Sequence, residues 1–183
     1  ASAPPVASFS TAATKCVGSP VAFTDASTNS PTSWAWTFPG STTPTSTVQN
    51  PSVTYTAGGT YTVTLTSANS SGTSTAVSST ITVSANPTVA ATSATVCSGT
   101  AANITASGAA TYSWNTGATT ASISVTPTIT TTYTVIGTNA AGCTNTKTTT
   151  VNVNPAPTVT VANATICSGN SANLMASGAT TYS

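Results

Sequence analysis

A repeat with a period of 70 residues (157 minus 87) limits what this chain can fold into. The segment 87–113 recurs as 157–183, with 17 of 27 positions identical and no gap. This alignment places Cys97 on Cys167 and Tyr112 on Tyr182. One small β-sandwich per repeat is typical of such a period. The chain is therefore expected to be a tandem of small domains.

Short β-like segments bounded by turn residues run through the chain, and no long amphipathic helix is visible. In segment 60–66 every second residue is apolar, so Tyr61, Val63 and Leu65 are predicted to face inward and a row of Thr outward. The expected fold class is all-β, with small sandwiches or barrels. For the first domain the expected strands are 6–10, 20–25, 33–38, 52–56, 60–67 and 75–83.

The predicted domains are a sandwich at 1–85, a repeat at 86–155 and the first strands of a further, incomplete repeat at 156–183. Two and a half strands cannot bury both faces of a core. We therefore expect the last segment to be ordered only through another chain or a continuation of the repeat. Strand 144–153 has only Lys147 to guard its edge, which favours contact between copies.

Charged side chains are almost absent. They are Lys15, Lys147 and Asp25, no histidine occurs, and the 46 Thr and 27 Ser provide most of the polar surface. Groups that transfer protons or hold metals are therefore missing, so we predict no enzyme, catalytic residue, metal site or cofactor. A net charge of +1 and the lack of a long apolar run predict neither nucleic-acid binding nor membrane insertion. For Asp25 we expect a role in a turn or backbone cap.

Three aromatic residues, Trp34, Trp36 and Phe38, alternate along one strand. One interpretation is a platform on which sugars stack; the other, which we prefer, is a sandwich core with a Trp on its third strand. Trp34 is then the candidate for partial exposure and aromatic contact with a ligand. The predicted core residues include Trp36, Phe38, Tyr61, Trp114 and Tyr133.

The first domain contains a set of characteristic segments: 6–9, 21–25, 33–40, 50–55 and 59–65. In these segments it resembles the PKD (polycystic kidney disease) domain in its bacterial form. The chain departs from the common Trp-Asp-Phe-Gly-Asp-Gly run, because Thr37 replaces the first Asp and Pro39-Gly40 follows Phe38.

In the repeats after Ala85, the segments 96–99, 112–115 and 139–143 are similar to immunoglobulin-like (Ig-like) modules. Such modules are found in tandem in long secreted proteins and adhesins of gliding, type IX-secreting bacteria, so the similarity implies tandem Ig-like sandwiches. It implies export to the cell surface or medium, and a role in attachment or spacing.

The four cysteines suggest one bridge. Segment 139–143 aligns with 69–73, so that Thr73 stands where the first domain would have Cys143. We predict a Cys97–Cys143 disulfide closing a loop of about 46 residues, which would contribute ~4 kcal/mol and indicate an oxidising compartment. The alternative is two buried free thiols. Cys16 and Cys167 lack partners within their own domains.

The predicted function is a structural module of a bacterial extracellular fibre or adhesin stalk, whose partners are copies of itself or neighbouring repeats. The alternative is a polysaccharide- or surface-binding module of a larger secreted protein. The Ser/Thr/Pro loop 41–47 is compatible with O-linked sugars, or is a plain polar loop.

Overall fold

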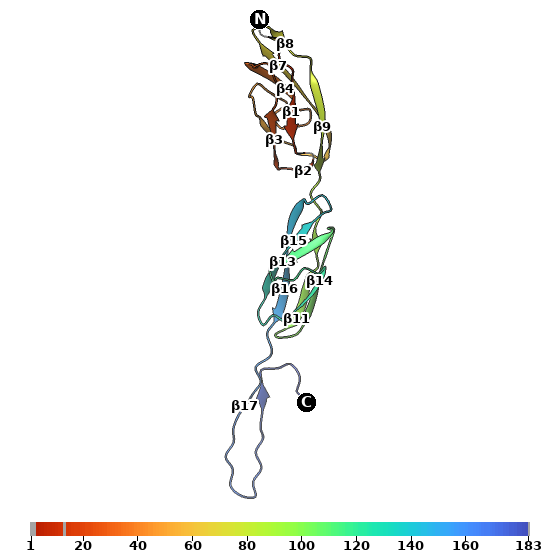
Figure 1. The fold of residues 1–183 in the computed structure, drawn as a ribbon. Helices are drawn as coiled ribbons and strands as arrows, with labels where there is room; N and C mark the ends of the chain where they lie inside the picture. The colour runs from red at the N-terminus through yellow and green to blue at the C-terminus, as the bar shows by residue number, and fades with distance from the viewer. Residues whose placement is uncertain (1–2, 13, 183) are drawn as a thin grey trace.

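The computed structural model describes residues 3–12 and 14–182. Two β-sandwiches follow each other end to end, and a thin two-stranded segment continues beyond them (Figure 1). No helix occurs among the described residues. Consequently, the described part of the chain has no helical stretch that could span a bilayer. The predicted all-β fold is confirmed.

The first sandwich packs a three-stranded sheet, in the order β1-β3-β6, against a larger sheet in the order β2-β9-β7-β4-β5, with β8 added to β7. The strands of the small sheet are β1 (Phe9–Thr11), β3 (Pro20–Asp25) and β6 (Ser52–Thr54). Those of the large sheet are β2 (Thr14–Cys16), β4 (Ser33–Thr37), β5 (Thr45–Ser46), β7 (Gly59–Asn69), β8 (Gly72–Thr73) and β9 (Val77–Ser84).

The second sandwich repeats this plan with fewer strands. Its sheets run β10-β12-β14 and β11-β16-β15-β13. The first comprises β10 (Ala90–Ala91), β12 (Ala102–Ser107) and β14 (Ser122–Val125). The second comprises β11 (Ala94–Cys97), β13 (Thr111–Trp114), β15 (Thr131–Thr138) and β16 (Thr144–Asn154).

Each sandwich has its own core. In β7, Val63 and Leu65 are fully buried, while the Thr residues on either side of each are not, as period-two alternation requires. Tyr61 is half-buried; it packs against the core and its ring lies 4.4 Å from that of Tyr55. Alternation therefore determines which way each side chain of β7 points. Tyr61 points inward but lies near the end of the strand, and so stays partly exposed.

Strand β16 is open along one side over part of its length. Its residues 144–151 pair with β15, and its last residues, 151–154, also pair in parallel with β11. Residues 144–150 have no paired strand on the side of β11, because β11 is short, and residues 152–154 have none on the side of β15. The edge therefore offers fewer free backbone groups for contact between copies than a fully open strand.

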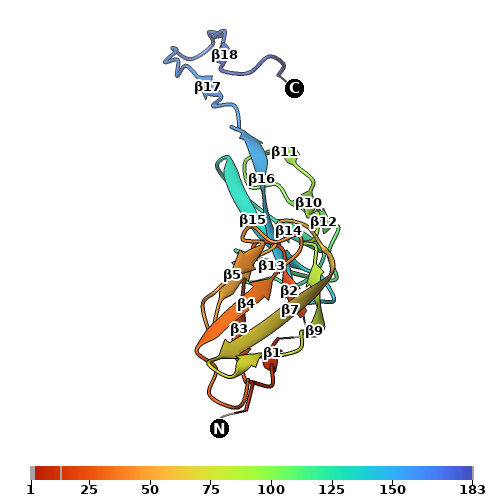
Figure 2. The ribbon, with the colours of Figure 1, turned by 90° about the horizontal axis from the view of Figure 1, so that it is seen from above.

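Beyond β16 the chain forms only β17 (Thr160–Val161) and β18 (Ala176–Ser177), as the turned view also shows (Figure 2). These strands pair Thr160 with Ser177, and β10 and β12 pair Ala90 with Ser107. Both residues of one pair lie 70 positions after those of the other, so the strand register is the same in the two repeats. Leu174 is 61% exposed, whereas its repeat counterpart Ile104 is 0% exposed. The segment has the local structure of a repeat without its core.

Candidate functional site: the junction between the sandwiches

The described residues contain no cluster of three or more His, Cys, Asp or Glu side chains that could hold a metal ion. The sole carboxylate, Asp25, accepts hydrogen bonds from the Ser27 backbone N–H (3.0 Å) and hydroxyl, and from Gln49 Nε2 (3.2 Å). Burial alone would raise the pKa of Asp25, but the hydrogen bonds from Ser27 and Gln49 outweigh it and hold the pKa below its usual value. The nearby Trp34 indole contributes least and does not reach hydrogen-bond geometry. Asp25 stabilises the turn after β3.

The aromatic side chains of β4 serve the core. Trp36 is buried, stacks on Phe38 at 5.6 Å and donates its indole N–H to Val48 O at 3.0 Å. Trp114, on the equivalent strand of the second sandwich, is also buried and donates to Thr120 O at 3.0 Å. Both indoles therefore combine an apolar environment with a satisfied N–H.

Trp34 is half-buried and packs against the same core. It lines a shallow hollow with Ser67, and its indole N–H has no hydrogen-bond partner among the described protein groups. Tyr133 is buried in the second core. Among the described aromatic side chains, only that of Tyr182 is largely exposed. The described surface therefore presents no row of exposed rings.

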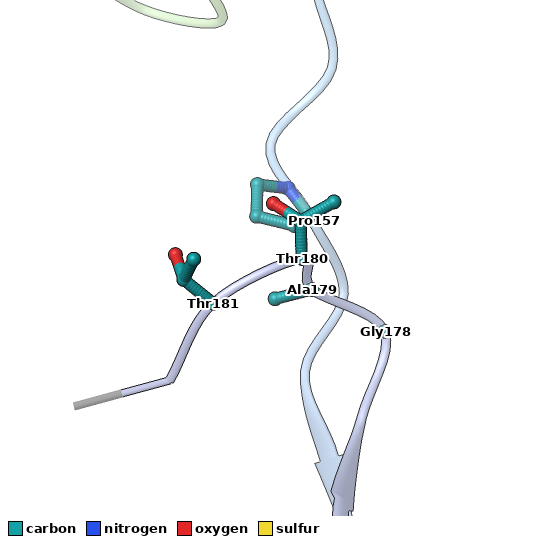
Figure 3. A pocket seen from close by; sticks show the side chains of 5 residues that line it. All are labelled: Pro157, Gly178, Ala179, Thr180 and Thr181. Atoms are coloured by element: carbon teal, nitrogen blue, oxygen red, sulfur yellow. The ribbon is translucent and has the colours of Figure 1, made fainter.

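Another hollow lies where the last segment turns back on itself (Figure 3). Its lining is Pro157, Gly178, Ala179, Thr180 and Thr181. These side chains supply methyl groups and hydroxyls, but no titratable group. The hollow lies in the segment that lacks a core, and offers no catalytic chemistry.

The junction between the sandwiches carries a disulfide, and the predicted Cys97–Cys143 pairing is wrong. Cys143 is bonded to Cys16 of the first sandwich, with the two Cα atoms 5.5 Å apart. Cys97 is an exposed free thiol, as is Cys167. Cys16 has no partner in its own sandwich, because its partner belongs to the next one.

Strand length explains the error. Cys143 directly precedes β16, whereas Cys97 pairs in register with Asn154 at the other end of this strand. The 11 residues of β16, at about 3.3 Å per residue, separate the two cysteines by roughly 35 Å. A disulfide requires Cα atoms within about 7 Å. The cysteines of this repeat therefore lie at opposite ends of the sandwich.

Asparagine side chains hold the linker beside the disulfide. Asn139 Nδ2 donates to Ala85 O at 2.8 Å, and Asn145 Nδ2 donates to Pro87 O at 2.9 Å. The Asn139 carboxamide oxygen accepts the backbone N–H groups of Ala141 and Cys143, at 3.0 and 2.9 Å, and so shapes the hairpin that carries the cysteine. The junction thus has two covalent connections and several hydrogen bonds.

Sequence reasoning missed the role of Cys16, although a signal was present. Cys16-Val17-Gly18 has the same Cys-x-Gly spacing as Cys97-Ser98-Gly99. Had the two cysteines been recognised as equivalent, Cys16 would have been placed at the end of the first domain that Cys97 occupies in the repeat, opposite the hairpin position of Thr73. A partner in the neighbouring domain then becomes the natural choice for Cys143.

Comparison with known proteins shows which family the first sandwich resembles. A family model for the PKD domain matches residues 2–85. No curated protein matches the chain. The PKD1 domain of Vibrio anguillarum Epp is 32% identical, with 44% of this chain and 94% of that chain covered and a TM-score of 0.38.

Two further solved structures are similar. The PKD1 domain of the Vibrio cholerae metalloprotease PrtV is 36% identical, with 44% of this chain and 96% of that chain covered and a TM-score of 0.37. A carbohydrate-binding module of the β-sandwich superfamily is 17% identical, with coverages of 75% and 56% and a TM-score of 0.44. The match to the family model identifies the first sandwich of this chain as a PKD domain.

Proposed function

We propose that the chain is a structural module of a bacterial extracellular fibre or adhesin stalk, which holds an attached part away from a surface. The observation that carries this proposal is the Cys16–Cys143 disulfide, which joins the facing ends of two successive sandwiches. The proposed module consists of the PKD domain at 1–85, the Ig-like repeat at 86–155 and the repeat segment at 156–183.

The disulfide restricts bending at the junction. A linker alone is one point of attachment, about which two domains can swing. Here the linker at Ala85 to Pro87 and the disulfide provide two points, and the Asn139 and Asn145 hydrogen bonds hold the linker itself. The remaining freedom is rotation about the line joining the two attachments. The pair of sandwiches therefore bends in fewer directions than a pair joined by a linker alone.

The disulfide also shortens the path of tension. A force applied at the two ends of the chain passes from β2 through Cys16 and Cys143 directly into β16. Residues 17–142, which form most of both sandwiches, lie outside this path. A stalk under load would gain from this arrangement, because its cores are shielded from unfolding.

An extracellular or cell-surface location is consistent with this role. Disulfides persist in oxidising compartments. The surface relies on the many Thr and Ser hydroxyls rather than on charge. PKD domains occur in secreted proteins, where they are typically non-catalytic modules. The polysaccharide-binding alternative receives less support, since Trp34 is half-buried and forms part of the core packing.

Single-molecule stretching tests the proposal. In the oxidised chain, the 127-residue separation between Cys16 and Cys143 should stay hidden, so that reduction or Cys16→Ser adds about 440 Å of contour length, at roughly 3.5 Å per residue. Cys97→Ser is the matched control and should leave the oxidised length unchanged. Release of the contour length of residues 17–142 from the oxidised chain would refute the role of the disulfide in transmitting force. Binding to insoluble polysaccharides that Trp34→Ala abolishes would support the alternative instead.

A further inference from the structure

Cys97 occupies the same place in the second sandwich that Cys16 occupies in the first. Strand β2 ends at Cys16, paired in parallel with Ser84 at the end of β9. Strand β11 ends at Cys97, paired in parallel with Asn154 at the end of β16. In both sandwiches the cysteine therefore lies at the end from which the chain leaves toward the next domain.

The turns that follow the two cysteines are also the same. The residue after each cysteine donates its N–H to the paired strand end, to Ser84 O at 3.0 Å and to Asn154 O at 3.1 Å. The next residue is a glycine with positive φ, 80° in Gly18 and 74° in Gly99. Gly18 donates to Tyr55 O at 2.9 Å, and Gly99 to Pro127 O at 3.0 Å. The two sites thus share backbone geometry as well as position.

Only the state of the thiols differs. Cys16 is bonded to the hairpin cysteine of the following sandwich, whereas Cys97 is exposed and free. The segment that follows Cys97's sandwich has the repeat sequence and strand register described above. In a full repeat, the counterpart of Cys143 lies 70 residues later, at position 213, beyond Ser183.

We propose that Cys97 is the site of a second inter-domain disulfide, formed with the hairpin cysteine of a following repeat of the same type. Each of the two thiols loses its proton, and together they give two electrons to a disulfide oxidant, such as oxidised glutathione, which leaves as two thiols. Successive junctions would then all be bonded across, from the exit end of one sandwich to the entry hairpin of the next. This inference rests on repeat geometry, and adds a covalent site to the proposed stalk.

Cys167 belongs to the same series. In its turn Asn170 N donates to Cys167 O at 3.2 Å, as Ser19 N does to Cys16 O (3.1 Å) and Thr100 N to Cys97 O (3.0 Å). Gly169 has the same positive φ, 86°. In a full repeat Cys167 would lie at the exit end, remote from its own hairpin. Cys167 is therefore not expected to bond to the hairpin cysteine of its own repeat, although it is the other free thiol that could compete with Cys97 for it.

An extended chain tests this directly. Residues 114–155 are repeated after Ser183, which completes the third repeat and adds a copy of Cys143. The chain is folded with oxidised and reduced glutathione and digested with pepsin, since Lys15, Lys147 and the added copy of Lys147, without any Arg, leave trypsin few sites. We expect the Cys97 peptide to be linked to the added hairpin, with Cys167 as the remaining free thiol. Alkylation of Cys97 should fall at least about tenfold.

The matched control places Thr at the added hairpin position, as Thr73 stands in the first domain, and should leave Cys97 fully reactive. A second extended chain, in which the third repeat is a complete copy of residues 87–155, guards against misfolding of the hybrid repeat. The Cys16–Cys143 bond in the same molecule reports whether oxidation has succeeded. With that bond closed, a free Cys97, a bond from the added cysteine to Cys167, or disulfide-linked dimers through Cys97 would each overturn the proposal. None of these results would alter the stretching behaviour of the first junction, so the two proposals fail independently.

Discussion

Replacing Cys16 with Ser should destabilise both sandwiches, although the substitution lies in only one of them. With a separation of 127 residues between the bonded cysteines, the chain-entropy estimate for a fully unfolded chain is ~5 kcal/mol. If one sandwich unfolds while the other stays folded, the disulfide still closes a loop of roughly 60–70 residues, which corresponds to ~4 kcal/mol. Since measured effects often fall below this model, we expect each sandwich to lose about 2–4 kcal/mol.

Denaturant unfolding followed by tryptophan fluorescence can resolve the two sandwiches. Trp36 reports on the first core and Trp114 on the second. A Trp114→Phe background leaves indoles only in the first sandwich, so that the two transitions can be assigned.

Cys97→Ser is the structurally matched control, because it alters an equivalent strand end whose thiol is free and exposed. It should change the free energy of unfolding by no more than about 0.5 kcal/mol. If Cys16→Ser weakens the first sandwich and leaves the transition of the second unchanged, the disulfide does not couple the stabilities of the two sandwiches.

Three further predictions concern the sandwiches individually. Trp36→Ala should cost about 3–5 kcal/mol in urea unfolding, because it empties the centre of the aromatic core; a loss below about 1 kcal/mol would contradict its core role. Gly108→Ala should cost at least about 2 kcal/mol in the same assay, since φ is +89° and an added Cβ would collide with Thr88 O; Gly99→Ala, with similar φ and open space, should cost less. Because the pKa of Asp25 is lowered in the folded state, its ionised carboxylate adds to the free energy of unfolding above the unfolded value of 3.8. This stabilisation is lost as pH falls through the folded pKa. Melting temperatures between about pH 6 and pH 2 should therefore fall less steeply in Asp25→Asn, and equal slopes would contradict the turn role.

Local patterns allowed the sequence to predict the fold class. The alternation in segment 60–66 depends only on which side of a strand each residue occupies, and β7 buries Val63 and Leu65 accordingly. The internal repeat likewise predicted small tandem domains, and β10–β12 and β17–β18 share one register at its period. Such features depend on neighbours along the chain, so sequence is enough to find them.

The cysteine pairing depends on contacts between strands that are far apart in the sequence. The sequence predicts that Cys97, at the early strands of its repeat, and Cys143, at the last turn, meet at one end of the sandwich, but the full length of β16 separates them. Which end of a sandwich a residue occupies follows from strand pairing across the sheet, here the parallel pairing of β11 with the last residues of β16. A pattern of residues along the chain does not contain this pairing.

The position of the disulfide follows from how a sandwich is entered and left. The chain enters the second sandwich beside the hairpin that carries Cys143, as the Asn139 bond to Ala85 O shows, and leaves it at Asn154, beside Cys97. A cysteine at the entry hairpin therefore faces the exit end of the preceding domain, where Cys16 lies. The first sandwich has Thr73 at its own entry hairpin, yet its equivalent asparagine, Asn69, still donates to Ala3 O at 2.9 Å. The hydrogen bond to the incoming chain is thus kept where the cysteine is not, so the asparagine positions the linker and the cysteine adds the covalent lock between domains.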